Sequence, residues 1–246
     1  GTLNALGGGT LGGAVGKLSA LNVNRVTDSA TTDTTGTSAK TLTANGSVDA
    51  ASIHLFNDAT LQMANGANLT GAVTTTTHNT GNLTMDGNST VTGAVGQAGT
   101  ALKQINAGVT SRTVSFNNGV VYATTLNYTG NGTVEMNGAS PTPSAPSYGF
   151  IGNVDFGTNG SGSGTFTLGD NVNLVTQNAT SPTADTQTSF QDANAATLRF
   201  AGTSTVTGDL GSASNTNNQN FQSVYAGAAG ETVTFNCKVY VASTTL

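Results

Sequence analysis

An internal repeat constrains the fold of this chain more than any other feature. Residues 61–73 align without gaps on residues 83–95 and share six of thirteen residues at a spacing of 22. Residues 198–211 match residues 83–96 at eight of fourteen positions. A short unit that recurs in this way is typical of proteins built from stacked structural repeats.

A longer repeat encloses the short one. Residues 113–126 and 232–246 both contain Thr-Val, Phe-Asn, Val-Tyr and Thr-Thr-Leu in the same order. A unit of about 22 residues is thus nested in one of about 115 to 120, with repeat units near 61–73, 83–126 and 198–246.

Within each copy, apolar and polar residues alternate with a period of two and are interrupted by Gly and Asn, which is typical of short strands joined by turns. No segment shows the sustained apolar stripe of an amphipathic helix. We therefore expect an all-β chain. The apolar positions of the second and third copies should point inward: Leu83, Met85, Val91, Leu198, Phe200 and Val206.

Many short, regularly spaced strands fit a sandwich, a barrel or a β-solenoid. The chain has no Trp and only 6% aromatic residues, so a thin core of small and branched side chains, completed by neighbouring turns, is the easier core to build. The sequence favours a right-handed parallel β-helix, or β-solenoid, of about ten or eleven turns and about 50 Å. Tandem β-sandwich domains are the alternative.

The solenoid is expected to run continuously through residues 1–246, as a fragment of a longer chain. Prolines, glycines and polar runs predict loops that leave the stack. These polar loop excursions lie near 28–38, 139–147, 157–164 and 211–220.

Charge and composition exclude several classes of partner. Gly, Thr, Asn and Ser make up 125 of the 246 residues, and the net charge is -5. The Lys and Arg residues are scattered singly, whereas a nucleic-acid surface needs them clustered, so we expect no nucleic-acid partner. Apolar runs such as residues 120–123 are far shorter than the ~18 residues of a membrane-spanning helix, so no span is expected here.

Residues 89–96 and 113–126 resemble the surface antigens of rickettsiae, the large outer-membrane proteins A and B. The resemblance covers most of residues 55–246. It implies an autotransporter, whose exported passenger is a β-solenoid and whose membrane anchor lies outside this chain. It implies no catalytic residue, and Cys237 stands where Gly is expected after Phe-Asn.

The sequence predicts no catalytic, cofactor-binding or metal-binding residue. His54 and His78 lie in unrelated settings, without a neighbouring Cys or acidic cluster. The single Cys237 excludes an internal disulfide and a cysteine-based metal site, and we expect a buried or strand-edge thiol. Residues 160–164 lack the strand-to-helix context of a nucleophile elbow and are interpreted as a linker.

Two alternative functions rest on specific residues. A polysaccharide-active β-helix enzyme, a lyase or glycosidase, needs paired carboxylates, for which the nearest candidates are Asp28 with Asp33 and Asp185 with Asp192. An ice-binding solenoid needs Thr-x-Thr pairs on one flat face. Such pairs occur at 41–43, 90–92, 165–167, 205–207 and 232–234, at irregular spacings.

The repetition, the low charge and the resemblance together predict a non-enzymatic structural or adhesive segment of an exported bacterial surface protein, without a cofactor. Its expected location is the extracellular face of a Gram-negative outer membrane. The expected partners are copies of itself, neighbouring surface proteins or a host-cell receptor.

Overall fold

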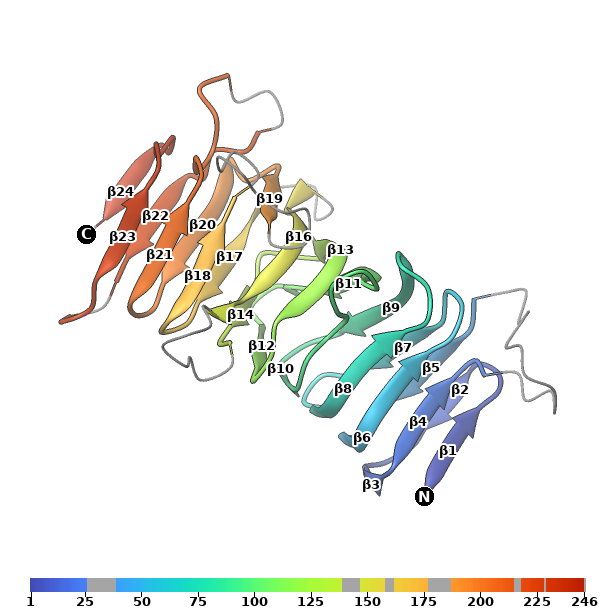
Figure 1. Cartoon of the computed structure of the whole chain (residues 1–246). Coiled ribbons are helices and arrows are strands. Elements are labelled where there is room, and N and C mark those ends of the chain that lie inside the picture. The colour runs from blue at the N-terminus through green and yellow to red at the C-terminus, as the bar shows by residue number, and fades with distance from the viewer. Residues whose placement is uncertain are drawn as a thin grey trace.

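The computed structural model describes residues 1–25, 39–138, 147–157, 162–176, 187–214, 218–227 and 229–245. These residues form β-strands joined by turns, and no α-helix occurs among them. The strands stack along one axis into an elongated molecule with the two chain ends at opposite ends of the stack (Figure 1).

The strands belong to three sheets. The twelve-stranded sheet contains β1 (Thr2–Ala5), β3 (Val15–Leu18), β4 (Ala20–Val23), β6 (Val48–Leu55), β8 (Leu69–Thr75), β10 (Ser89–Thr92), β12 (Thr113–Asn117), β14 (Thr133–Met136), β17 (Ser163–Leu168), β20 (Ala195–Phe200), β22 (Ser223–Ala226) and β24 (Ser243–Thr245). The eight-stranded sheet contains β2 (Gly9–Leu11), β5 (Thr41–Ala44), β7 (Thr60–Met63), β9 (Thr80–Met85), β11 (Leu102–Ala107), β13 (Val121–Tyr128), β16 (Phe150–Asp155) and β19 (Thr188–Gln191). The four-stranded sheet contains β15 (Ser147–Tyr148), β18 (Val172–Val175), β21 (Ser204–Thr207) and β23 (Val233–Asn236).

The strands pair in the parallel direction throughout the described part of the chain. Each strand pairs with strands one turn away rather than with its neighbour in sequence. This arrangement confirms the predicted all-β parallel solenoid and excludes tandem antiparallel sandwiches.

The length of one turn varies along the stack. Val91 lies beside Leu69, 22 residues earlier, and Thr133 lies beside Thr113, 20 residues earlier. Thr165 lies beside Thr133, at a spacing of 32, and this turn contains residues 139–146 and 158–161, which lie outside the described residues. At about 4.8 Å per strand, the eleven strands on the main path of the twelve-stranded sheet give a stack of about 48 Å, as expected.

The predicted loops agree with the structure only in part. The loop near 28–38 lies outside the described residues, as do most of the loops near 139–147 and 157–164. However, Ser147 belongs to β15, and Ser163 and Gly164 belong to β17, because each pairs with the turn that follows it. The described residues within 211–220 form no strand.

One hydrophobic core runs along the axis. The six predicted inward residues are all at most 1% exposed: Leu83, Met85, Val91, Leu198, Phe200 and Val206. They form rows with their equivalents in neighbouring turns, as Leu61 does with Leu83 and Ile105. Each turn therefore completes the burial of the next, as the sequence predicts.

The core contains more aromatic rings than the predicted core of small and branched side chains. Tyr128 packs on Phe156 with ring centroids 4.4 Å apart, and Phe156 contacts Phe221 at 5.8 Å. The contacts continue from Phe221 through Phe190 and Phe166 to Phe150, at 4.8, 5.9 and 6.4 Å. Six rings, of which Phe150 and Phe156 lie at the two ends of β16, thus form one connected column. The predicted core of small and branched side chains missed this column, because each turn contributes only one or two of the rings.

Glycines mark corners at which the chain bends and stacked turns approach closely. Gly71 has φ +129° and Gly93 has φ +126°, a region that L-residues with a side chain rarely adopt. A Cβ at Gly71 would lie 1.8 Å from the backbone oxygen of Ala50 in the preceding turn. The recurring Thr-Gly-Ala-Val of the short repeat is therefore a corner at which successive turns approach closely.

The copies of the long repeat do not lie on the same face of the solenoid. In the second copy, Leu83 lies on β9 of the eight-stranded sheet and Val91 on β10 of the twelve-stranded sheet. In the third copy the equivalent Leu198 lies on β20 of the twelve-stranded sheet, and Val206 lies on β21 of the four-stranded sheet. The repeat thus encodes a strand, a turn, a second strand and a corner, shifted by one face.

Candidate functional site

The outer surface of the eight-stranded sheet carries two parallel rows of polar residues. The rows flank an inward row that includes Leu61, Leu83 and Ile105. The first row contains Thr41, Thr60, Asn82, Gln104, Thr125, Asn153 and Ser189. The second contains Thr10, Thr43, Gln62, Thr84, Asn106, Asn127, Asp155 and Gln191. Among these described residues, Asp155 alone carries a charge.

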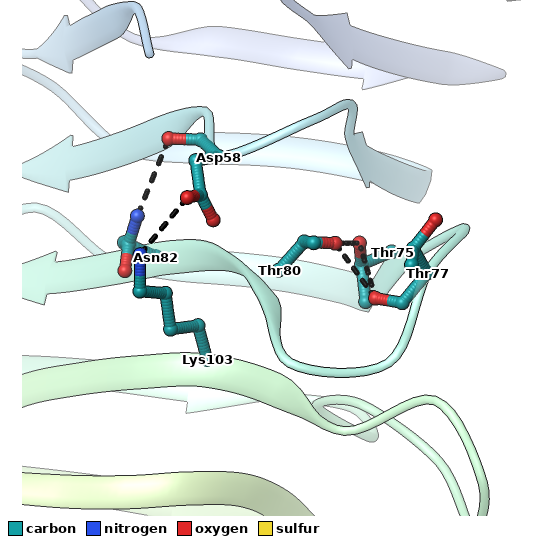
Figure 2. Close-up of polar contacts among 6 residues, drawn as sticks. All are labelled: Asp58, Thr75, Thr77, Thr80, Asn82 and Lys103. Carbon is teal, nitrogen blue, oxygen red and sulfur yellow. Dashed lines mark hydrogen bonds and ion pairs between the residues drawn. The ribbon is translucent and has the colours of Figure 1, made fainter.

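Neighbouring turns are linked by side chains along this surface. Asn106 Nδ2 donates to Thr84 Oγ1 at 3.1 Å, and Asn127 Nδ2 donates to Asn106 Oδ1 at 3.3 Å. Lys103 Nζ lies 2.9 Å from Asp58 Oδ2, and Asn82 Nδ2 donates to the Asp58 backbone oxygen at 3.3 Å (Figure 2). The amide contacts link consecutive turns and the ion pair spans two turns, so the surface is ordered along the axis.

The described carboxylates also act as links between turns. Ser115 Oγ donates to Glu135 Oε2 at 2.6 Å, and Gln62 Nε2 donates to Asp86 Oδ2 at 2.5 Å. Asp192 accepts from Asn218 Nδ2 at 3.0 Å. Asp28, Asp33 and Asp185 lie outside the described residues, so the structure places neither predicted carboxylate pair. The described chain holds no cluster of three or more His, Cys, Asp or Glu side chains suited to a metal ion.

The two histidines lie in different settings. His54 Nδ1 lies 2.8 Å from Thr74 Oγ1, and its ring packs on Phe56 with centroids 4.8 Å apart, which gives it structural contacts on β6. His78 is exposed, in the loop between β8 and β9, and lines a groove. The groove is the candidate functional site.

The groove has a volume of about 340 Å³, at the lower end of the roughly 300–1,000 Å³ typical of ligand sites. The groove arises because successive turns pass the same corner of the solenoid in two different ways, some with a loop and others with a continuous strand. Two successive turns carry loops, at 76–79 and 96–101, whereas β13 and β16 pass the same corner without a break. The loops form one wall, and the two continuous strands form the floor.

Local hydrogen bonds shape the wall. Thr80 Oγ1 donates to the Thr77 backbone oxygen at 2.6 Å and lies 2.6 Å from Thr75 Oγ1 (Figure 2). This cluster closes the base of the loop that carries His78. In the next turn, the backbone of Gln97 pairs with that of Thr100 in an antiparallel bridge, which closes the second loop.

The floor of the groove contains a β-bulge and a side-chain amide that hydrogen bonds hold in one orientation. The register of β13 against β16 shifts between Tyr122 and Thr125, and such bulges redirect side chains; here Thr124 is exposed in the groove. Asn153 Nδ2 donates to Gln191 Oε1 at 2.6 Å, and Ser189 Oγ donates to Asn153 Oδ1 at 2.9 Å. These two bonds orient the Asn153 amide.

The groove is lined by uncharged groups, both polar and apolar, and the apolar side chains are those of Ala101, Ala123 and Ile151. Its hydrogen-bonding side chains are those of His78, Gln97, Tyr122, Thr124, Asn153, Gln187 and Ser189, and no Asp, Glu, Lys or Arg is among the described residues that line it. Chemically, this arrangement offers amide and hydroxyl donors and acceptors around one phenol ring. It offers no carboxylate pair.

Comparison with family models, with curated proteins and with solved structures finds no match to this chain. Among the described residues there is no helix of sufficient length and apolar character to cross a membrane. The resemblance to rickettsial surface antigens therefore stays a prediction.

The Thr-x-Thr pairs do not share one face. Thr41 and Thr43 lie on the eight-stranded sheet, whereas the pair at 90–92 and the pair at 165–167 lie on the twelve-stranded sheet. The pairs at 205–207 and 232–234 are out of register, because Thr205 lies beside Thr234. The one-face shift of the long repeat accounts for part of this scatter, since it moves equivalent threonines to different sheets.

Sequence reasoning did not identify the groove. The signal was present as a difference in length. Residues 96–101 separate Val95 from Leu102, whereas Tyr122 alone separates the partners of these two residues, Val121 and Ala123. An alignment of whole turns, rather than of repeat copies, would reveal it.

Cys237 lies directly after β23, half-buried and packed against the core. Burial raises the pKa of its thiol, the nearby Asp209 charge raises it further, and a backbone hydrogen bond at Leu210 acts in the opposite direction. The thiolate is the reactive form. The raised pKa thus makes this thiol less reactive near neutral pH than an ordinary cysteine.

We expect iodoacetamide to alkylate Cys237 more slowly in the folded chain than in the urea-denatured chain, with a pH midpoint above the ordinary value of about 8.5. Because the folded state retains this proton longer, its contribution to stability is present below the ordinary pKa and is lost as the pH rises through the folded pKa. Rates measured by mass spectrometry from pH 7 to 10 test this. A folded midpoint at or below the denatured one would contradict it.

Proposed function

We propose that this chain is a non-enzymatic structural and adhesive segment of an exported bacterial surface protein. It would serve as a rigid spacer that carries a binding surface. The observation that carries the proposal is the uninterrupted stack: one core and one set of parallel sheets extend for about 48 Å at the spacing of paired strands.

Such a stack suits this role for a physical reason. Each turn contacts only its neighbours, so the rod gains length without a larger core, and loops can be added without disturbing the stack. Side-chain links between turns, such as Asn127 to Asn106, stiffen the outer surface. The resemblance of residues 89–96 and 113–126 to rickettsial surface antigens further supports a location on the extracellular face of a Gram-negative outer membrane.

The outer rows of the eight-stranded sheet support adhesion. They present hydroxyl and amide groups on a regular lattice with one carboxylate, so long-range repulsion between copies is weak. Partners of the proposed segment are copies of this chain, neighbouring surface proteins or a host-cell receptor.

Protease treatment of intact source cells tests the location. The native protein should be cleaved before lysis, while a periplasmic marker in the same cells stays intact. Immunoblotting with an antibody against this chain would report both. Protection until lysis would overturn the proposal of an exposed surface segment.

A further inference from the structure

We propose that the groove between the 76–79 and 96–101 loops and the corner of β13 and β16 binds a neutral oligosaccharide. This inference deepens the adhesive role proposed above and rests on it. The evidence lies in the groove's floor, its lining chemistry and its fixed amide group.

The two floor strands are closed to a peptide that would add as a strand. β13 pairs with β11 on one side and β16 on the other, and β16 pairs in turn with β19. Strand addition requires a free edge, and this sheet has its edges at the terminal strands β19 and β2. Over β13 and β16, a ligand must be recognised by side chains.

The side chains favour a ligand rich in hydroxyl groups. Gln97, Thr124 and Gln187 contribute amide and hydroxyl groups at the wall and floor, and each such group can both donate and accept hydrogen bonds. Tyr122 is half-buried and lines the groove, and its phenol combines an apolar ring with a polar hydroxyl, which suits the mixed surface of a sugar. No Lys or Arg is among the described lining residues, which favours a neutral ligand over an anionic one.

Asn153 supplies the fixed element of the site. Its contacts with Gln191 and Ser189 use one N–H and one lone pair. An amide has two N–H donors and an oxygen with two lone pairs, so Asn153 keeps one donor and one acceptor for a ligand. Its orientation is set before binding, which reduces the entropic cost of association.

Gly152 allows the two floor strands to lie close together. Its φ is +140°, and a Cβ at this position would lie 1.8 Å from the Ala123 backbone oxygen. The strand pair places Ile151 beside Tyr122, and Asn153 follows Gly152 along the same floor.

The test uses the purified chain and an array of neutral, sialylated and sulfated oligosaccharides, followed by calorimetric titration with the neutral oligosaccharide that binds best. We expect Tyr122→Ala to weaken binding by at least about fivefold. The matched control is Tyr225→Ala, since Tyr225 is 44% exposed and lies on β22 of the twelve-stranded sheet. The control should leave the affinity within about twofold.

Gln97→Ala is the second variant, because Gln97 is exposed on a loop and its truncation should leave folding intact, as circular dichroism would verify. It should also weaken binding. Absence of binding, binding only of anionic glycans, or equal loss in Tyr122→Ala and Tyr225→Ala would overturn the inference. A chain that is exposed on cells but binds no neutral glycan would overturn the groove inference alone, whereas glycan binding by a chain protected until lysis would overturn only the proposed location.

Discussion

Replacing Gly71 by Ala should destabilise the solenoid by about 3–5 kcal/mol. The new Cβ would lie 1.8 Å from the backbone oxygen of Ala50, and φ at this position is +129°. Because the obstructing atom is backbone, two stacked turns would have to move apart. Urea denaturation followed by circular dichroism measures the change in the free energy of unfolding.

Two glycines serve as matched controls for this change. Gly66 has φ +83°, but a Cβ at this position would meet no atom within 4 Å, so Gly66→Ala isolates the backbone strain and should cost about 1–2 kcal/mol. Gly9 lacks both the positive φ and the close neighbour, so Gly9→Ala should change stability by less than about 0.5 kcal/mol. Equal effects at Gly71 and Gly66 would contradict the close approach of turns at this corner.

Truncation of the aromatic column should have a comparable effect. Phe156 is fully buried between Tyr128 and Phe221, so Phe156→Ala should cost about 3–5 kcal/mol, through lost burial and the cavity left behind. Phe156→Leu, which fills most of the space, should cost less than half as much. The same urea titration measures both.

The exposed Tyr225 gives the control for this prediction. Its ring is 44% exposed, so Tyr225→Ala should alter the free energy of unfolding by about 0.5 kcal/mol or less. If Phe156→Ala were as mild as Tyr225→Ala, the six rings would not form a packed column, and the core would be as thin as the sequence predicts.

Local alternation was enough to predict the fold class and the inward faces. Leu83, Met85 and Val91 were identified as core from their period of two, and they are buried. The period determines which side of a strand a residue occupies. The repeat then implies that each inward residue meets its equivalent one turn away, as Leu61 meets Leu83.

The features that depend on how turns are juxtaposed could not be predicted in this way. Phe156 and Phe221 are 65 positions apart in the sequence, yet their rings are 5.8 Å apart, because their turns bring different faces to the same point of the core. The candidate groove likewise combines His78 with Asn153. Predicting the groove requires the number of residues in every corner between His78 and Asn153, and matching the repeat copies does not provide these numbers.

The one-face shift of the long repeat has a geometric consequence for any array of such units. Equivalent positions 115 residues apart, such as Leu83 and Leu198, stand on adjacent sides of the rod. If further copies followed with the same offset, a group attached at the equivalent position of each copy would move by one face of the rod per copy. The fourth copy would then present this group on the same face as the first copy. A duplicated epitope would then be displayed on every side of the rod rather than along one line.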